Sequence, residues 1–412
     1  MLRPWAKHRW IVSGKNVFMT TDLTPHPEHI LAASSHRNPY PYYASRVAGP
    51  ALVFDAPRKL WVASSAASVK AVLGNPACHV RPTAEPVPAA IIGSAAGEVF
   101  GHLVRMNEGV RHDAPKLALQ RFLASVDLAR VQLHTEAIAA MQMGNGPLQG
   151  AALSRWAFEV PVMAVADMLG FAEGELPQVA RWMADFVACL SPVSTPAQLA
   201  ASAEAASALL ARFAELVRGA SAHPGSARAR LQHEAAQAGW HDAGALLANA
   251  VGLLSQTYEA TAGLIGNSVV ALATRPGLLE VMGREPGQLL QMVNEVSRFD
   301  PSVHNTRRFV AEATQVAGVS LQPGDVVLLV LAAAGRDPLC NARPNALLLD
   351  RLDRDVPGFG RGPHQCPGQA LACQIAAAAI KALLVSGQLQ AVSSFSWQYR
   401  PSMNARIPVF LD

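Results

Sequence analysis

The feature that most limits the fold is a long alanine-rich, helix-forming region from about residue 108 to residue 273. Its longest apolar part runs from Ala243 to Thr274 and is interrupted by four polar residues: Asn249, Gln256, Glu259 and Asn267. A charge and three amides in such a stretch favour a buried helix over a membrane span. Turn residues break the rest of the region into separate helices at residues 144–150, 191–196 and 223–225.

A minor β part is expected on both sides of this helical region. The runs "ALVFDA" and "KLWVASS" in the first hundred residues have the composition of short strands. Residues 307–331 alternate with a period of two, and "QPGD" inside them predicts a turn joining two strands. After Cys366 a helix resumes and ends at Gly387. The chain is therefore predicted to be mainly α with minor β.

The length allows one large domain or two to three ordinary ones and does not choose between them. Of the 412 residues, half are hydrophobic and 16% are charged, which allows a large buried core. We predict a single domain over residues 39–412 and a partly disordered N-terminal leader over residues 1–38, with Met19 as an alternative start. A net charge of +4 is too small to indicate nucleic-acid binding. Scattered cysteines without a CxxC pair, and no visible secretory signal or membrane span, predict a cytoplasmic monomer with no membrane attachment.

The stretch "GFGRGPHQCPGQ", residues 358–369, surrounds one thiol with residues that leave the backbone bare. Pro367 suits the first position of a helix, which would place Cys366 at a helix N-terminus, where a thiolate is favoured. Gly360 and Gly368 leave room for a flat, bulky ligand, and Phe359 is expected to shield one side of the sulfur. These conditions suit a thiolate that binds the metal of a large cofactor. The alternative is a buried structural cysteine.

The pattern F-G-x-G-x-H-x-C-x-G in this stretch resembles the haem-binding loop of the cytochrome P450 family. The resemblance extends from about Pro39 to the C-terminus. It implies the cytochrome P450 fold, with haem b between the central long helix and the helix that follows the cysteine loop. It also implies Cys366 as the axial ligand of the iron.

A second motif of the family lies ahead of the cysteine loop. Glu295 and Arg298 form E-x-x-R, which alone would be an ordinary ion pair on one helical face. Arg351 stands where the family's "PxxFxxxR" segment places a second arginine, with leucine in place of the phenylalanine. The resemblance implies that these three residues form a buried structural network that holds the cysteine loop.

The haem propionates need cationic or donor partners, and the resemblance supplies four. His112 and Lys116 match the family's H-x-x-x-R with lysine in place of arginine, and their spacing puts both on one helical face. Lysine keeps the charge but loses the two-pronged contact of a guanidinium. Arg308 matches the family arginine before the β segment, and His364 is expected to reach the other propionate.

The central helix departs from the family. Aligned on "TAGLIGN", Glu259 takes the place of the family's acid and Ala260 that of its oxygen-activating threonine. Monooxygenation needs protons while the O–O bond breaks, and Ala260 has no hydroxyl to help deliver them. Thr257, Thr261 or a hydroxyl of the substrate are three replacements. The alternative is that Glu259 is a solvated polar break in a bent helix.

Pocket positions follow from the resemblance alone and suit a medium-sized, partly polar molecule. They are Ile91, Ile92, Gln256, Tyr258, Ala260, Val303, His304 and Met403.

The resemblance implies a haem-thiolate monooxygenase that oxidises a small or medium organic substrate, free or carrier-bound, in secondary metabolism. O₂ and electrons would come through a ferredoxin or flavodoxin with its reductase. Two alternatives stay open: an enzyme driven by peroxide or another oxidant, because of Ala260, and a non-catalytic haem sensor or carrier. A zinc site at His364 and Cys366 is weak, because only two ligands are local.

Overall fold

The computed structural model describes residues 26–144, 146–191, 194–218 and 225–412. Most of the predicted leader, including Met19, lies outside the described residues. The α-helices are α1 (Tyr40–Val47), α2 (Ala66–Leu73), α3 (Ala95–His102), α4 (Asp113–Ala124), α5 (Leu128–Met143), α6 (Gly150–Leu169), α7 (Leu176–Ala188), α8 (Pro196–Arg218), α9 (Ala227–Gln237), α10 (Ala243–Ala273), α11 (Pro276–Arg284), α12 (Leu289–Phe299), α13 (Leu331–Ala334) and α14 (Gln369–Val385). The strands are β1 (Leu52–Asp55), β2 (Leu60–Ala63), β3 (Cys78–His79), β4 (Thr306–Val310), β5 (Thr314–Val316), β6 (Val319–Leu321), β7 (Val326–Leu329), β8 (Ser396–Tyr399) and β9 (Pro408–Leu411). This confirms the prediction of a mainly α chain with minor β.

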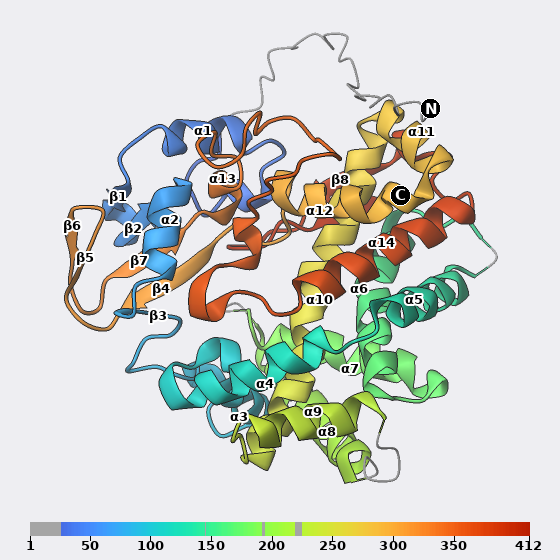
Figure 1. Cartoon of the computed structure of the whole chain (residues 1–412), viewed down its shortest axis with the longest axis horizontal. Helices are drawn as coiled ribbons and strands as arrows, with labels where there is room; N and C mark the ends of the chain where they lie inside the picture. The colour runs from blue at the N-terminus through green and yellow to red at the C-terminus, as the bar shows by residue number, and fades with distance from the viewer. Residues whose placement is uncertain (1–25, 145, 192–193, 219–224) are drawn as a thin grey trace, which may run out of the picture.

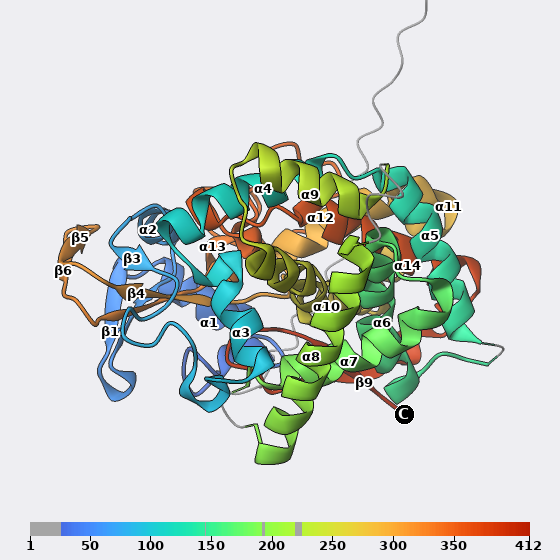
Figure 2. The same cartoon turned by 90° about the horizontal axis from the view of Figure 1, so that it is seen from below.

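The long helix α10 runs through the middle of the molecule and organises the helical part around it (Figures 1 and 2). Asp242 caps its N-terminus by accepting the N–H of Ala245 over 2.9 Å. It packs against α3, α6, α8, α12 and α14. Both ends of α10 are largely buried, whereas residues 256–260 are partly or fully exposed. The middle of the central helix therefore faces space that other elements do not fill.

The β part lies to one side of the helices (Figure 1). Five strands form one sheet in the order β1-β2-β7-β4-β3, in which β2 and β7 are parallel and the other pairs antiparallel. The "QPGD" turn, residues 322–325, joins β6 to β7, but β6 pairs with β5 and β7 with β2 and β4. The predicted turn between two strands is therefore confirmed, but the two strands that it joins do not pair with each other. The hairpin that forms is β5–β6, which turns at Ala317 and Gly318, both with positive φ.

The segment before α1 is tied to the C-terminal hairpin β8–β9. The Arg406 guanidinium donates to the carbonyls of Ser34, His36 and Arg37 over 3.2, 2.6 and 3.0 Å. The Ser34 hydroxyl donates in turn to the Ser402 carbonyl over 2.6 Å. Residues 34–37 are thus already packed against the rest of the chain. The domain boundary at residue 39 stays a prediction.

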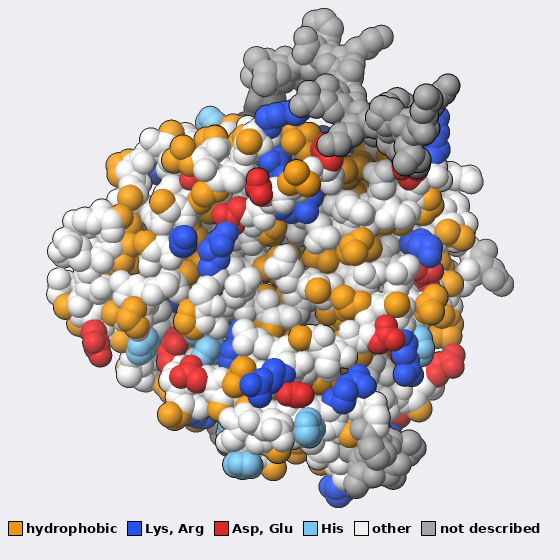
Figure 3. Space-filling model, in the orientation of Figure 1, with side chains coloured by type: hydrophobic (Ala, Val, Ile, Leu, Met, Phe, Trp, Pro, Cys, Tyr) orange, Lys and Arg blue, Asp and Glu red, His pale blue; other side chains and the backbone are white. Residues whose placement is uncertain are grey.

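One helical stretch of the described residues, Gly362–Val385, is long and apolar enough to cross a membrane. It includes α14, and 61% of its apolar window is buried inside the protein. Core helices of large proteins have the same composition, so this is weak evidence for a span. On the face shown in Figure 3, acidic and basic side chains are interspersed over the described residues.

Candidate functional site

Backbone hydrogen bonds and two glycines with positive φ build the loop around Cys366. The Cys366 N–H donates to the Phe359 carbonyl over 2.8 Å and closes the loop on itself. Gly360 has a φ of 69° and Gly362 a φ of 66°. Residues with a Cβ rarely adopt this left-handed conformation, so the course of the backbone requires glycine at both positions.

The helix after the loop begins later than predicted. α14 starts at Gln369 with Gly368 as its N-cap, and Pro367 and Gly368 form a turn between Cys366 and the helix. Burial raises the pKa of the Cys366 thiol, while the Gly368 N–H and the charge of Lys116 act against that rise. The Gly368 N–H, at the N-cap of α14, thus favours the thiolate, but burial has the larger effect on the pKa of the thiol.

The Cys366 side chain is exposed although the residues around it are dense enough to raise its pKa by burial. The two observations agree if the sulfur faces a hollow enclosed by protein. A Cβ on Gly368 would lie 3.9 Å from the Cys366 sulfur. The missing side chain thus keeps the space beside the sulfur open. Phe359 packs against the buried cluster around α12 and α14.

The four predicted propionate partners lie near this loop. The rings of His112 and His364 are 4.2 Å apart between centroids. Lys116 on α4 donates from Nζ to the Gln365 carbonyl, beside the cysteine. Arg308 on β4 is 6% exposed, and burial lowers its pKa. Lys116 therefore contacts the loop backbone directly.

The sequence analysis missed one acid that lies among these cations. Glu108 accepts a hydrogen bond from His364 Nε2 over 2.9 Å and another from the Val80 N–H over 2.9 Å. Burial alone would raise its pKa, but these bonds hold the pKa of Glu108 below its usual value. Its charge also acts on Arg308. In the sequence, the position of Glu108 shortly before His112 was the feature that could have indicated this role.

The E-x-x-R pair forms the centre of a buried ionic network. Glu295 Oε1 lies 2.6 Å from Arg298 Nη2 and 3.1 Å from Arg351 Nε. Arg354, which the sequence analysis did not single out, adds a third guanidinium with Nε 2.9 Å from Oε2 of the same carboxylate. Arg298 also donates to the carbonyls of Gly335, Pro344 and Ala346. One carboxylate thus gathers three arginines and fixes the backbone that leads into the cysteine loop.

The polar residues in the middle of α10 are already partly engaged. Glu259 Oε1 lies 3.2 Å from Arg400 Nη1, which follows β8. The Thr257 hydroxyl donates to the Leu253 carbonyl over 2.8 Å. Thr261 is 2% exposed. The predicted acid, Glu259, is therefore ion-paired with the C-terminal hairpin. The Thr257 hydroxyl donates its hydrogen bond within the helix.

The comparisons with known proteins agree with this geometry. The sequence profile of the family described as Cytochrome P450 matches residues 288–394, which contain both the E-x-x-R network and the cysteine loop. The crystal structure of CalO2 superposes with a TM-score of 0.79 at 22% identity, covering 91% of this chain and 95% of that one. Residues 288–394 thus match the cytochrome P450 family, and the chain has the fold of solved cytochromes P450.

Curated relatives are bacterial cytochromes P450. The biotin biosynthesis cytochrome P450 of Bacillus subtilis (strain 168) is 27% identical over 264 residues, 62% of this chain and 64% of that protein. Cytochrome P450 144 of Mycobacterium tuberculosis (strain ATCC 25618 / H37Rv) is 31% identical over 239 residues, 57% of this chain and 54% of that protein. The chain thus spans less than two thirds of these relatives. The solved structure of P450BioI in complex with a hexadec-9Z-enoic acid ligated acyl carrier protein has a TM-score of 0.75 at 23% identity, covering 91% of this chain and 97% of that one.

Cytochromes P450 bind haem through a cysteine thiolate, and the residues of this chain fit that cofactor. Two buried nitrogens beside the loop, His112 Nε2 and His364 Nδ1, have no hydrogen-bond partner among the described residues. Buried polar atoms without partners are costly, so each indicates a polar group that these residues do not supply. Because the other ring nitrogen already bonds Asp113 or Glu108, each of the two donates to an anion when its imidazole is protonated. The two nitrogens suit the carboxylates of one haem, and the open sulfur beside them suits its iron. The described residues hold no cluster of three or more metal-ligating side chains, so the zinc alternative gains no support.

The predicted pocket residues of this cytochrome P450 differ in exposure. Ile92 and Met403 are 68% and 40% exposed. Ile91 is 2% exposed and belongs to the core cluster that also contains α3 and α4 residues. Tyr258 packs its ring against Phe158 at 4.9 Å between centroids. Gln256, Ala260 and Val303 are exposed or partly exposed.

His304 lies in a closed polar cluster and presents no accessible surface to a pocket. It is 0% exposed, and its Nδ1 lies 2.9 Å from the Tyr43 hydroxyl. Its Nε2 is 3.7 Å from Asp300 Oδ1, and Asp300 is also bound by Arg406 over 2.8 Å. The structure thus places His304 in the packing between α1 and the C-terminal hairpin. The sequence-based assignment of His304 to the substrate pocket is not supported.

Burial of His304 predicts a loss of stability in acid. Burial lowers the pKa of His304 from 6.5 to about 4, although Asp300 opposes the shift. Between these two values the unfolded state binds more protons than the folded state, so the free energy of unfolding falls as the pH falls. The His304 part amounts to on the order of 3 kcal/mol. We expect urea unfolding of His304→Gln to show a flatter pH dependence over this range than the native sequence.

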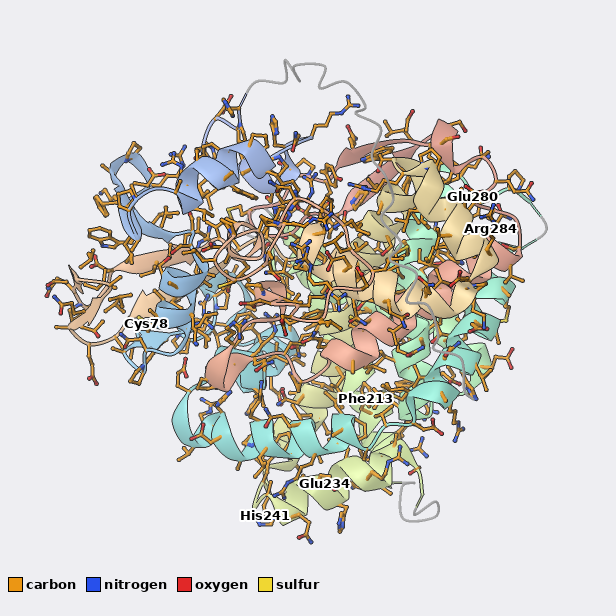
Figure 4. The ribbon with its side chains drawn as sticks, turned by 45° about the horizontal axis from the view of Figure 1, so that its top comes forward. Cys78, Phe213, Glu234, His241, Glu280 and Arg284 are labelled. Atoms are coloured by element: carbon orange, nitrogen blue, oxygen red, sulfur yellow. The ribbon has the colours of Figure 1, made fainter. Side chains whose placement is uncertain are left out.

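The control is His241→Gln, because His241 lies exposed in the loop before α10 (Figure 4). This variant should keep the pH dependence of the native sequence. Equal slopes for all three proteins would contradict the prediction.

Proposed function

We propose that this chain is a haem-thiolate monooxygenase that inserts one oxygen atom of O₂ into a small or medium organic substrate. The observation that carries the proposal is the accessible Cys366 sulfur beside two histidine nitrogens that no described residue binds. The family assignment supplies the cofactor, haem b, and Cys366 is its proposed axial ligand. The named activities of the relatives, such as "6-deoxyerythronolide B hydroxylase", agree with this class of reaction.

When bound, haem supplies the activation of oxygen, and the chain's own residues hold the cofactor and control the protons. His112, His364, Lys116 and Arg308 are proposed to bind the propionates, because they bring positive charge and donors to one side of the loop. The Glu295 network keeps the backbone before the loop in place. Cys366 is held by its N–H bond to Phe359, which fixes the direction of the sulfur.

Glu259 is the proposed proton source within the chain. Its side chain is 42% exposed and in contact with Arg400, so it can exchange protons with solvent while staying in position. Ala260 provides no hydroxyl, and Thr257 donates its proton to Leu253 in the present rotamer. The proton route from Glu259 would be completed by a rotation of Thr257, by a water held near Thr261 or by a hydroxyl of the substrate.

Replacing Glu259 tests this role. We expect Glu259→Gln to lower oxygen-dependent turnover about 100-fold, because a positioned acid contributes about that factor to proton transfer. The haem content and the ferrous carbonyl spectrum should stay unchanged. Product formation per electron consumed is the measurement, since slow proton delivery diverts electrons to hydrogen peroxide.

Two further variants separate the routes. Thr257→Val should lower turnover only if the Thr257 hydroxyl takes part. Ala260→Thr should raise turnover if the pocket merely lacks the hydroxyl and lower it if another route is in use. Unchanged coupling in Glu259→Gln would contradict the role of Glu259.

The second candidate function is oxidation driven by peroxide. The observation that favours it is the absence of a free hydroxyl at Ala260 together with the internal bond of Thr257. Turnover with hydrogen peroxide but not with a redox partner would select it. Gas binding without product and without a substrate-induced spin-state change would select the non-catalytic sensor or carrier.

A ferredoxin or flavodoxin with its reductase is the proposed electron donor, and we propose a cytoplasmic monomer active in secondary metabolism. The substrate is either free or carrier-bound, and the solved complex of P450BioI with an acyl carrier protein makes the second form worth testing. The deciding experiment reconstitutes the purified protein with a ferredoxin, its reductase and candidate substrates. Formation of an oxygenated product that requires all three components would support the proposal, and a protein without haem would overturn it.

A further inference from the structure

Arg105 is a half-buried arginine whose Nε is buried and unpaired among the described residues. It lies in the 3-10 turn η4 (Val104–Met106), which follows α3. A buried guanidinium normally has its N–H groups satisfied, because leaving them unpaired costs free energy. The Arg105 Nε therefore needs a hydrogen-bond acceptor that the described residues do not provide.

The turn that carries Arg105 is fixed to the central helix. Asn249 on α10 accepts the Val104 N–H over 2.9 Å and donates to the His102 carbonyl over 2.7 Å. Gly252, one turn further along α10, allows Leu103 to pack closely, since a Cβ there would lie 2.7 Å from Leu103 Cδ2. Arg105 is thus held in place against α10.

Arg105 shares a carboxylate with a second arginine. Glu259 is the carboxylate that acts on Arg105, and burial lowers the pKa of Arg105 to about 10, so the guanidinium stays charged at neutral pH. Glu259 is already paired with Arg400 over 3.2 Å. Arg105 thus has no full counterion of its own among the charges that act on it.

These charges are separate from the proposed propionate partners. Glu108 acts on Arg308 and binds His364, whereas Glu259 acts on Arg105 and binds Arg400. One cluster adjoins the cysteine loop, and the other adjoins the middle of the central helix. Arg105 thus lies with the groups proposed for the reaction, not with those proposed to hold the haem.

We propose that Arg105 binds a carboxylate of the substrate, so that the oxidised molecule is an organic acid. This rests on the proposed function. A carboxylate would supply the counterion that Glu259 shares with Arg400, and it matches the planar, forked donors of a guanidinium. A neutral molecule in the same space would leave the Arg105 Nε unpaired. Gln256, exposed on the same side of the helix as Asn249 and Gly252, is a further donor for the same anion.

Iron-binding probes test this without knowledge of the substrate. The haem-loaded protein is titrated with 1-alkylimidazoles of graded chain length and with the same molecules carrying a terminal carboxylate, and binding is followed by the shift of the Soret band. At the best length we expect the carboxylate probe to bind about 10- to 100-fold more tightly than its neutral match. Arg105→Gln should remove this preference, and Arg105→Lys should keep part of it. The control Arg130→Gln, on the exposed face of α5, should keep all of it.

Three outcomes would overturn the inference. One is equal affinity of both probe types at every chain length in the native sequence. Another is a carboxylate preference that survives in Arg105→Gln. The third is a loss of haem from Arg105→Gln while the haem-loaded fraction keeps its preference, which would make Arg105 a propionate partner. The ferrous carbonyl spectrum of each sample reports thiolate ligation independently, so a failure of the proposed function is seen separately.

Discussion

Cys366→Ser will lose the red-shifted Soret band that a thiolate ligand gives to a ferrous carbonyl haem, and with it oxygen-dependent turnover. Serine keeps the size and the backbone N–H bond to Phe359, so the loop should still form. What is lost is the sulfur, whose electron donation favours cleavage of the O–O bond. We expect no measurable oxygenated product from the variant. The carbonyl difference spectrum and product analysis on the same preparation provide the measurement.

The matched control for this substitution is Cys340→Ser. Cys340 is also a free, exposed cysteine, but it lies outside the glycine-rich loop. Its replacement should leave the carbonyl spectrum and turnover unchanged. A thiolate-type spectrum that persists in Cys366→Ser, or that disappears in Cys340→Ser, would refute the assignment of the axial ligand.

Glu295→Gln will destabilise the protein by about 3–5 kcal/mol, because it leaves three guanidinium groups without their shared counterion. Arg298 and Glu295 have side chains with no exposed surface, so solvent cannot compensate for the lost charge. Burial alone would raise the pKa of Glu295, but the hydrogen bonds and charges of Arg298 and Arg354 hold it below its usual value. The carboxylate therefore contributes stability above its unfolded pKa, and this contribution is lost as the pH falls through the folded pKa.

Urea unfolding at neutral pH, followed by circular dichroism, measures the effect. The control is Glu280→Gln, which breaks an ion pair with Arg284 on the surface of α11 (Figure 4). Exposed pairs contribute little, so this variant should stay within about 0.5 kcal/mol of the native sequence. Similar stability of the two variants would show that the buried network is not what holds this region together.

The parts of the site that sequence could predict are local in the chain. The glycines, the proline and the cysteine of residues 358–369 act within one loop, so their spacing is enough to indicate a ligand site. The length of α10 was equally readable, because one apolar stretch forms one helix. The E-x-x-R pair has ideal spacing on one helical turn. Its partners Arg351 and Arg354 lie in irregular structure, and the sequence indicated only the first of them.

Contacts between distant segments were not readable in the same way. Glu259 meets Arg400 only because the C-terminal hairpin packs beside α10. His304 looked like a pocket residue, but Tyr43 and Asp300 enclose it from two other parts of the chain. The "QPGD" turn has the residues of a hairpin turn. The strands on its two sides, β6 and β7, nevertheless pair in different sheets, β6 with β5 and β7 with β4. Turn chemistry sets the bend, and tertiary packing chooses the partners.

The tie between Arg406 and the carbonyls of Ser34, His36 and Arg37 bears on how the chain matures during synthesis. Residues near position 34 leave the ribosome long before Arg406 is made, so they cannot reach their final place until synthesis has passed Arg406. The helices built around α10 can pack earlier, because their partners lie closer in sequence. Closure of the layer formed by the early segment and the hairpin β8–β9 is therefore a late step of folding, and the buried side chains Ile30 and Tyr43 stay without their final packing until then.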